Sequence, residues 1–254
     1  MTHFEAIILG IVEGLSEFLP ISSTGHLILA SALLKLNQTE AHKVLEVTIQ
    51  SGAMLAVVFI YRKQLASSSE LLKKLCFAFL PTGALGFLLY KLVKSFFQPS
   101  LVSYMLIAGG VAFIAIELWI KDRPETVASI QDISYRQAFT IGLIQSLSMI
   151  PGVSRSGAII MGGLALGISR KDAAEFSFLL ALPTMLAATA YDIYKNHSVF
   201  VFGDWQNILI GLITSFIFAV IAIKALLKYI TNHTFIPFGI YRIVVGVAFL
   251  IFMP

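Results

Sequence analysis

Two short polar stretches interrupt an otherwise strongly apolar chain, and they restrict its fold more than any other feature. The first is LPISSTGH (19–26) and the second is IPGVSRSG (150–157). Each separates two apolar arms that are shorter than the roughly 20 residues a helix needs to cross a bilayer; the arms are residues 4–19 and 21–36, and residues 136–150 and 153–168. We predict two re-entrant helix hairpins, whose broken backbone has to lie inside protein or along an aqueous cavity.

The rest of the chain has the composition of a membrane protein. Of its 254 residues, 57% are hydrophobic and 13% charged, whereas soluble domains carry about 25% charged residues. Six longer apolar runs are expected to cross the membrane: 44–61, 75–95, 101–120, 175–194, 207–228 and 236–252. We predict an all-α polytopic membrane protein with a single transmembrane domain over 1–254. Its net charge of +4 is modest, so membrane lipid is the expected partner and nucleic acid is not.

The two polar stretches are related to each other. A shift of 132 residues aligns GIVEGLSEFLPISSTG (10–25) with GLIQSLSMIPGVSRSG (142–157). The identical pairs are Gly10 and Gly142, Leu15 and Leu147, Ser16 and Ser148, Ser22 and Ser154, and Gly25 and Gly157. We therefore predict an internal duplication, with a first repeat over 1–122 and a second over 133–254.

The number of spans predicts how the repeats are oriented. Three transmembrane helices follow each hairpin, and because three is odd the second repeat enters from the opposite face, as an inverted-topology repeat. Basic residues gather on one side of this arrangement: Arg62, Lys63, Lys73, Lys74, Lys121, Arg123, Arg136, Arg170, Lys171, Lys224 and Lys228. Fewer lie on the other: Lys35, Lys43, Lys91, Lys94 and Lys195. The positive-inside rule makes the first side cytoplasmic, so both termini and the mouth of the first hairpin are expected to face outward.

Glu13 and Glu17 are the first candidate functional residues. They are four residues apart, so on a helix they share one face. Two neighbouring carboxylates in a low-dielectric site repel each other unless a cation lies between them or one is protonated. The pair therefore predicts a divalent-metal site, most simply for Mg²⁺, with Ca²⁺ as the other ion considered. The structural alternative is protonation, or pairing with a basic residue of the second half.

The segment PISSTGH has the features of a helix start. Pro20 is expected to end the first arm, and Ser22, Ser23 and Thr24 are candidates to cap the second. The free N–H groups at such a helix start favour an anion. His26 lies three residues after Ser23, about one turn, which is the spacing of a nucleophile and its base. The alternative is that these residues only cap the helix and satisfy hydrogen bonds.

The second stretch adds a permanent positive charge. Arg155 lies between Ser154 and Ser156, with Gly157 allowing close approach of the backbone. The planar guanidinium suits phosphate oxygens, although a purely structural salt bridge to Glu13 or Glu17 is the alternative. Gln50 is also expected to line the site. Four other acids near span ends are expected to form interfacial pairs or to reach the interface: Glu46, Glu117, Glu175 and Asp192.

Together these residues predict a buried site for a phosphate or pyrophosphate group. A substrate that reaches it from the bilayer would be an amphiphile with a phosphate head and a lipid tail, and the expected reaction is hydrolysis. The rival class is a transporter or flippase of an anionic or phospholipid-like substrate, because inverted repeats with broken helices are typical of transporters. A carrier does not need a Ser–His pair beside a metal site, which favours hydrolysis.

The motifs GIVEGLSEFLPISSTGH and PGVSRSG, with IYR near the end, closely resemble the bacterial undecaprenyl pyrophosphate phosphatases of the bacitracin-resistance type. The resemblance implies a divalent-metal-dependent enzyme of the bacterial inner membrane, found as dimers. It would convert undecaprenyl pyrophosphate into the monophosphate carrier lipid of peptidoglycan synthesis, in a site that opens to the periplasmic face.

The resemblance also assigns roles to residues. The acidic pair of the family falls on Glu13 and Glu17, and its serine, histidine and arginine fall on Ser23, His26 and Arg155. Its neighbouring phosphate contacts fall on Thr24 and Ser154. We expect Ser23 to attack the terminal phosphorus while His26 accepts its proton. Direct attack by water, with Ser23 only binding phosphate, is the alternative.

Overall fold

The computed structural model describes residues 2–36, 40–95, 99–127, 129–195 and 205–252. Within these ranges the chain forms ten α-helices and two short 3₁₀ helices, as an all-α fold requires. In chain order they are α1 (His3–Ser16), α2 (Ser23–Leu33), α3 (Glu40–Ser67), α4 (Ser69–Ser95), α5 (Pro99–Ile120), η1 (Ile130–Asp132), α6 (Tyr135–Gln145), η2 (Ser146–Met149), α7 (Arg155–Ala165), α8 (Arg170–Lys195), α9 (Trp205–Ile230) and α10 (Ile236–Phe252).

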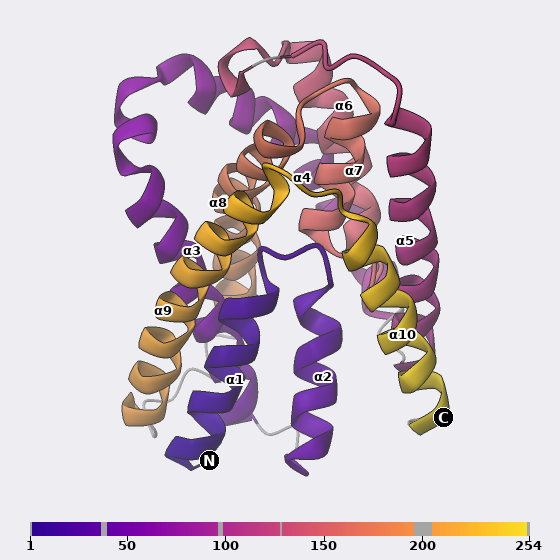
Figure 1. Ribbon diagram of the computed structural model, residues 1–254. Coiled ribbons are helices and arrows are strands. Elements are labelled where there is room, and N and C mark those ends of the chain that lie inside the picture. Colours follow the sequence, from indigo (N-terminus) through magenta and orange to yellow (C-terminus); the bar gives the residue numbers. More distant parts are fainter. Residues whose placement is uncertain (1, 37–39, 96–98, 128, 196–204, 253–254) are drawn as a thin grey trace.

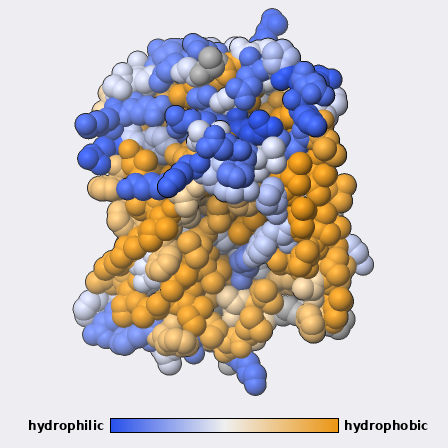
Figure 2. Space-filling model, viewed as in Figure 1, coloured by the Kyte–Doolittle hydropathy of each residue, from blue (hydrophilic) through white to orange (hydrophobic). Residues whose placement is uncertain are grey.

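Five helices of the described chain are long and apolar enough to cross a membrane. Their candidate spans are Leu45–Ser67, Ser69–Leu89, Ser100–Ile120, Arg170–Tyr191 and Trp205–Ile230. The sixth predicted span forms α10 over the expected residues, but with 17 residues it belongs to the shorter apolar helices. On the face that Figure 2 shows, hydrophobic residues form a broad belt below a hydrophilic upper end, and further hydrophilic residues lie at the lower left. The chain is therefore a multi-pass membrane protein.

Both predicted hairpins are present, but their first arms end earlier than expected. Helix α1 ends at Ser16, three residues before residue 19, and residues 17–21 form a turn. Helix α6 ends at Gln145 and continues as the tighter helix η2. A proline follows each break and has no N–H to extend an α-helix. Figure 1 shows α1 and α2 in the lower half of the view and α6 and α7 in the upper half, with both chain termini at the lower end.

Close helix packing fixes the rotation of α1. A β-carbon on Gly14 would lie 2.5 Å from the carbonyl oxygen of Ser215 on α9, so only a glycine lets the two backbones approach this closely. Gly10 makes a similar contact with Gly211, four residues before Ser215. Small residues at this spacing are a common solution for helix packing in membranes. The packing holds α1 so that the neighbouring Glu13 side chain lies inside the protein, 1% exposed.

Arg242 on α10 joins the two hairpin turns. Its side chain is completely buried. The guanidinium donates hydrogen bonds to the carbonyl oxygens of Pro20 in the first turn (3.2 Å), Gly152 in the second (3.0 Å) and Met105 on α5 (3.1 Å). Gly109 leaves the room for it, because a β-carbon there would lie 2.1 Å from Nη2. Arg242 thus bonds directly to both turns that carry the polar motifs.

Candidate active site

A polar pocket of about 180 Å³ lies where the two hairpin turns meet. Six of the predicted site residues line it: Glu17, Ser22, Ser23, Thr24, Ser154 and Arg155. Gln50, which was expected to line the site, does so as well. The fold therefore brings residues that are more than 130 positions apart in the sequence into one cavity.

The second helix of each hairpin, α2 or α7, begins after a serine in an unusual backbone conformation. Ser22 is the N-cap of α2 and Ser154 is the N-cap of α7, and their φ angles are 71° and 72°. This left-handed region is strained for residues other than glycine, and such strain is concentrated at functional sites. The Ser154 hydroxyl caps its helix by accepting a hydrogen bond from the Gly157 N–H at 3.1 Å. Both helices start at the pocket, so their N-terminal dipole ends favour an anion there.

Glu17 connects the two sides of the pocket. The Ser23 hydroxyl donates a short hydrogen bond to one of its carboxylate oxygens. The other oxygen pairs with Nη2 of Arg155 at 3.1 Å, and Nη1 of Arg155 is held by the carbonyl oxygen of Ser177 at 3.0 Å. The Glu17 side chain is 6% exposed and that of Arg155 is 12% exposed. A buried carboxylate bonded to a serine hydroxyl is an arrangement that can activate the serine oxygen.

His26 is oriented differently from the expectation for a base beside Ser23. Its Nδ1 lies 2.8 Å from the Ser22 carbonyl oxygen, and its Nε2 lies 2.7 Å from the Tyr241 hydroxyl. The imidazole also stacks on the Tyr241 ring, with centroids 5.6 Å apart. Because the carbonyl can only accept, Nδ1 carries the proton and Nε2 accepts one from Tyr241. The expected approach of Ser23 and His26 is therefore not seen, since Ser23 turns to Glu17.

Glu13 lies one helical turn before Glu17, and neither of its carboxylate oxygens has a hydrogen-bond partner in the described chain. Arg155 attracts this carboxylate, whereas Glu17 and Glu46 repel it. A buried, unbonded carboxylate next to a second one fits a bound divalent cation. The described residues contain no group of three or more His, Cys, Asp or Glu side chains that could hold a metal ion. The remaining ligands of such an ion would have to be phosphate oxygens and water.

Ser156 and Gly157 do not line the pocket. The Ser156 side chain is 1% exposed, and its hydroxyl donates to the carbonyl oxygen of Leu19 at 2.9 Å. The backbone N–H of Gly157 donates its hydrogen bond to the Ser154 hydroxyl. Ser156 instead braces the second turn against the first, and Gly157 caps the start of α7. We assign no phosphate contact to either residue.

Four pocket or site residues were missed by the sequence analysis. Ser148 and Met185 line the polar pocket, and Tyr241 and Arg242 hold His26 and the two turns. Ser148 could have been found as the repeat partner of Ser16. The IYR motif could have directed attention to Tyr241 and Arg242. Met185 has no such signal, since it reaches the pocket only through the packing of α8.

The acids near span ends mostly behave as expected. Glu117 is 2% exposed and accepts hydrogen bonds from the Arg170 guanidinium, and Glu175 lies 3.9 Å from Lys171. Both pairs lie near the ends of the candidate spans Ser100–Ile120 and Arg170–Tyr191. Glu46 differs, because it interacts electrostatically with Glu13. The side chain of Asp192 lies outside the described residues.

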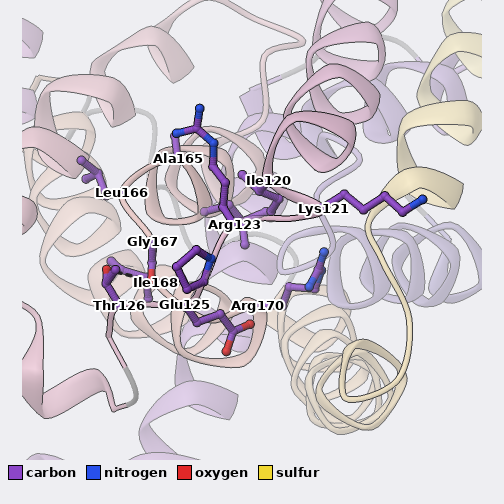
Figure 3. Close-up of a pocket in the computed structure, with 12 residues that line it drawn as sticks. Ile120, Lys121, Arg123, Glu125, Thr126, Ala165, Leu166, Gly167, Ile168 and Arg170 are labelled. Carbon is purple, nitrogen blue, oxygen red and sulfur yellow. Dashed lines mark hydrogen bonds between the residues drawn. The ribbon is translucent and has the colours of Figure 1, made fainter.

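A second pocket, of about 390 Å³, is lined by Lys121, Arg123, Glu125 and Arg170 among other residues (Figure 3). In Figure 3 the charged ends of Lys121 and Arg123 point in different directions. The guanidinium of Arg123 lies 3.6 Å from the centroid of the Trp119 ring, and Arg170 is paired with Glu117. An active site needs convergent polar groups, so the pocket around Glu17 is the better candidate.

Residues 6–248 match the family model described as Bacitracin resistance protein BacA. Similar curated proteins include the undecaprenyl-diphosphatase of Persephonella marina, 59% identical with both chains fully covered. That of Sulfurihydrogenibium sp. is 58% identical over 98% of both chains. That of Methanococcus aeolicus is 46% identical over 99% of both. The match covers both hairpins and every helix between them, and the chain therefore belongs to the BacA family of bacitracin resistance proteins.

Proposed function

We propose that this enzyme hydrolyses undecaprenyl pyrophosphate to undecaprenyl phosphate and inorganic phosphate, and so recycles the carrier lipid of peptidoglycan synthesis. The observation that carries the proposal is the pocket in which Ser23 bonds to Glu17 beside Arg155, at the start of two helices. Relatives up to 59% identical carry the name undecaprenyl-diphosphatase. An anion-binding pocket with an activated hydroxyl, inside a multi-pass membrane protein, suits a lipid pyrophosphate.

In the first step the Ser23 oxygen attacks the terminal phosphorus, and Glu17 accepts the hydroxyl proton through the bond it already makes. A bond forms between the serine oxygen and phosphorus, while the bond from that phosphorus to the bridging oxygen breaks. Undecaprenyl phosphate leaves with the bonding electrons. Arg155 and the N-termini of α2 and α7 stabilise the negative charge on the phosphate oxygens.

In the second step the oxygen of water bonds to the phosphorus of the phosphoserine, and the bond from that phosphorus to the Ser23 oxygen breaks. The Ser23 oxygen takes back the proton held by Glu17, and inorganic phosphate leaves with the oxygen and protons of the water. His26 positions the start of α2 through its bonds to Ser22 and Tyr241. A divalent cation, Mg²⁺ or Ca²⁺, held by Glu13 and Glu17 would add positive charge next to the phosphate oxygens. The alternative, direct attack by water on the bound pyrophosphate, uses Glu17 as the base for water.

We further propose an inverted-topology repeat in the bacterial inner membrane, with the active site open to the periplasmic face. The matching φ angles of Ser22 and Ser154 support the duplication. The opposite placement of the α1–α2 and α6–α7 hairpins in Figure 1 supports the inversion. Basic residues, including Lys121 and Arg170, lie near the end of the molecule opposite the chain termini. By the positive-inside rule, this distribution supports a cytoplasmic location for that end.

The direct test is phosphate release from undecaprenyl pyrophosphate by the purified protein in detergent with Mg²⁺. Ser23→Ala and Glu17→Gln should each lower kcat by about 100-fold or more, because they remove the attacking oxygen and its proton acceptor. Ser51→Ala is the matched control. The Ser51 hydroxyl bonds only within its own helix, to the carbonyl oxygen of Val47, and its loss should leave kcat unchanged.

An active parent that keeps its rate in both pocket variants would place the chemistry elsewhere. A folded parent that releases no phosphate in the presence of Mg²⁺ would contradict the enzyme proposal. The same protein in liposomes would then be assayed for transbilayer movement of the lipid, which is the activity expected of a flippase.

A further inference from the structure

An apolar pocket of about 430 Å³ lies between α4 and α8. Phe79 and Phe87 line it from α4, Ala187 and Ala188 from α8, and Met149 from η2. Phe87 is 74% exposed, so the pocket opens onto the apolar surface of the spans Ser69–Leu89 and Arg170–Tyr191. A ligand in this pocket would have one end at the protein interior and the other in the bilayer.

The apolar pocket adjoins the polar one. Ser148 lines both, and the adjacent residues Thr184 and Met185 of α8 line the apolar and the polar pocket respectively. The protein thus offers a charged pocket and an apolar pocket side by side, with Ser148 in the wall of both. This is the shape needed by a molecule with a pyrophosphate head and a hydrocarbon tail.

The wall between α4 and α8 suits hydrocarbon. The hydroxyl of Thr82 donates to the carbonyl oxygen of Gly142, and that of Thr184 donates to the carbonyl oxygen of Leu180, both at 2.8 Å. Their protons are used inside the protein, which leaves the pocket surface less polar. A β-carbon on Gly86 would meet only the methyl group of Met149, at 3.6 Å, so the glycine faces open space.

A fourth pocket, of about 480 Å³, is the competing place for a tail. It lies beside α1 and α10 and is lined by Leu15, His26, Phe238 and Tyr241 among others. It shares no lining residue with the polar pocket. The bonds of His26 to Ser22 and Tyr241 lie at its edge. The pocket between α4 and α8 is therefore the better continuation of the phosphate site.

We propose that the pocket between α4 and α8 binds the part of the isoprenoid tail next to the pyrophosphate. The proposal rests on the function proposed above and specifies where that substrate lies. The small side chains of Gly86 and Ala188 then determine specificity for a prenyl chain, because they leave the volume that the tail occupies.

The test fills the pocket and separates tail binding from head binding. Ala188→Phe, with Gly86→Leu as a second variant, is compared with Leu15→Phe, which places a phenyl ring in the pocket beside α1. Steady-state kinetics with undecaprenyl pyrophosphate measure KM for the whole lipid. Inorganic pyrophosphate, added as a competitive inhibitor with Mg²⁺ in excess, measures Ki for the head group alone.

We expect Ala188→Phe and Gly86→Leu to raise the lipid KM by about tenfold or more, because the larger side chains occupy volume that the tail would fill. A change of one methylene group in a hydrophobic pocket already alters recognition by about tenfold or more. The Ki of pyrophosphate should stay unchanged in both, which also shows that the phosphate site is folded. Leu15→Phe should leave both constants unchanged. An unchanged lipid KM in both Ala188→Phe and Gly86→Leu, or a rise confined to Leu15→Phe, would overturn the proposed tail site. A parent without phosphatase activity would overturn the proposed function, a result distinguishable from either of these.

Discussion

At the scale of single residues, the chemistry depends on which group receives the Ser23 proton. The sequence spacing favoured His26, which lies one turn after Ser23. In the folded chain the Ser23 hydroxyl bonds to Glu17, and both nitrogens of His26 are used by Ser22 and Tyr241. Spacing along a helix predicts that two side chains can meet, but their rotamers are decided by the other partners within reach. Glu17 reaches Ser23 across the turn that separates α1 from α2.

The two candidate bases predict different rates of phosphoserine formation. If Glu17 takes the proton, Glu17→Gln should slow the appearance of phosphoserine in a rapid-quench experiment by about 100-fold or more. His26→Gln should slow it much less, because the glutamine can keep a bond to Tyr241. Equal losses in the two variants would make His26 part of the proton transfer. Failure to trap phosphoserine in the active parent would favour direct attack by water.

At the scale of helices, α10 does more than cross part of the membrane. It carries Arg242, whose guanidinium bonds to the carbonyl oxygens of Pro20 and Gly152. The helices are broken at the two hairpin turns, so carbonyl groups there lack helical hydrogen-bond partners. Lipid cannot supply such partners, so they have to come from the protein. A buried arginine supplies several donors in fixed directions. The broken helices and Arg242 therefore depend on each other.

Arg242→Lys tests this dependence, because lysine keeps the charge but cannot bond to both turns in the same geometry. We expect a loss of about 2 kcal/mol of stability, or a Tm lower by about 4–8 °C for a chain of this size. We also expect reduced kcat, since the turns carry the site. Arg62→Lys is the control, as Arg62 is exposed and bonds only to the carbonyl oxygen of Phe59 in its own helix. Equal Tm values for the two variants would show that Arg242 does not hold the turns.

At the scale of the whole molecule, two hairpins from opposite ends meet in the middle. Figure 1 shows the α1–α2 hairpin in the lower half of the view and the α6–α7 hairpin in the upper half. Ser23 from the first hairpin and Arg155 from the second line the same pocket. Neither hairpin alone contains both the carboxylates and the arginine. The hydrophilic ends and the hydrophobic belt in Figure 2 fit a bilayer around this site. The orientation proposed from the basic residues then decides from which side the head group enters.

Cysteine labelling tests the orientation. In a Cys76→Ser background, Lys121→Cys lies at the basic end and Lys35→Cys at the other end, and both positions are exposed. A membrane-impermeant thiol reagent should label Lys35→Cys in intact cells and Lys121→Cys only after permeabilisation. The reverse pattern would place the site on the cytoplasmic side. Phosphatase activity of each variant serves as the check that the protein is folded.

The sequence by itself determined the all-α membrane class, the two hairpins and most of the pocket. These are local properties, since apolar length and the positions of Pro, Gly and Ser fix where helices can run and where they break. It also offered a salt bridge from Arg155 to Glu13 or Glu17 as an alternative to phosphate binding, and the structure pairs Arg155 with Glu17. The inverted repeat and the bound metal stay predictions.

Only the tertiary structure decided how the polar groups pair. In the folded chain Ser23 bonds to Glu17, and Ser156 bonds to the Leu19 carbonyl oxygen and does not line the pocket. Arg242, on the last helix, bonds to both turns. Each of these contacts except the first joins residues far apart in the chain, and each depends on the distance and rotation of packed helices. A linear pattern carries the periodicity of one helix, but it does not carry the contacts between helices.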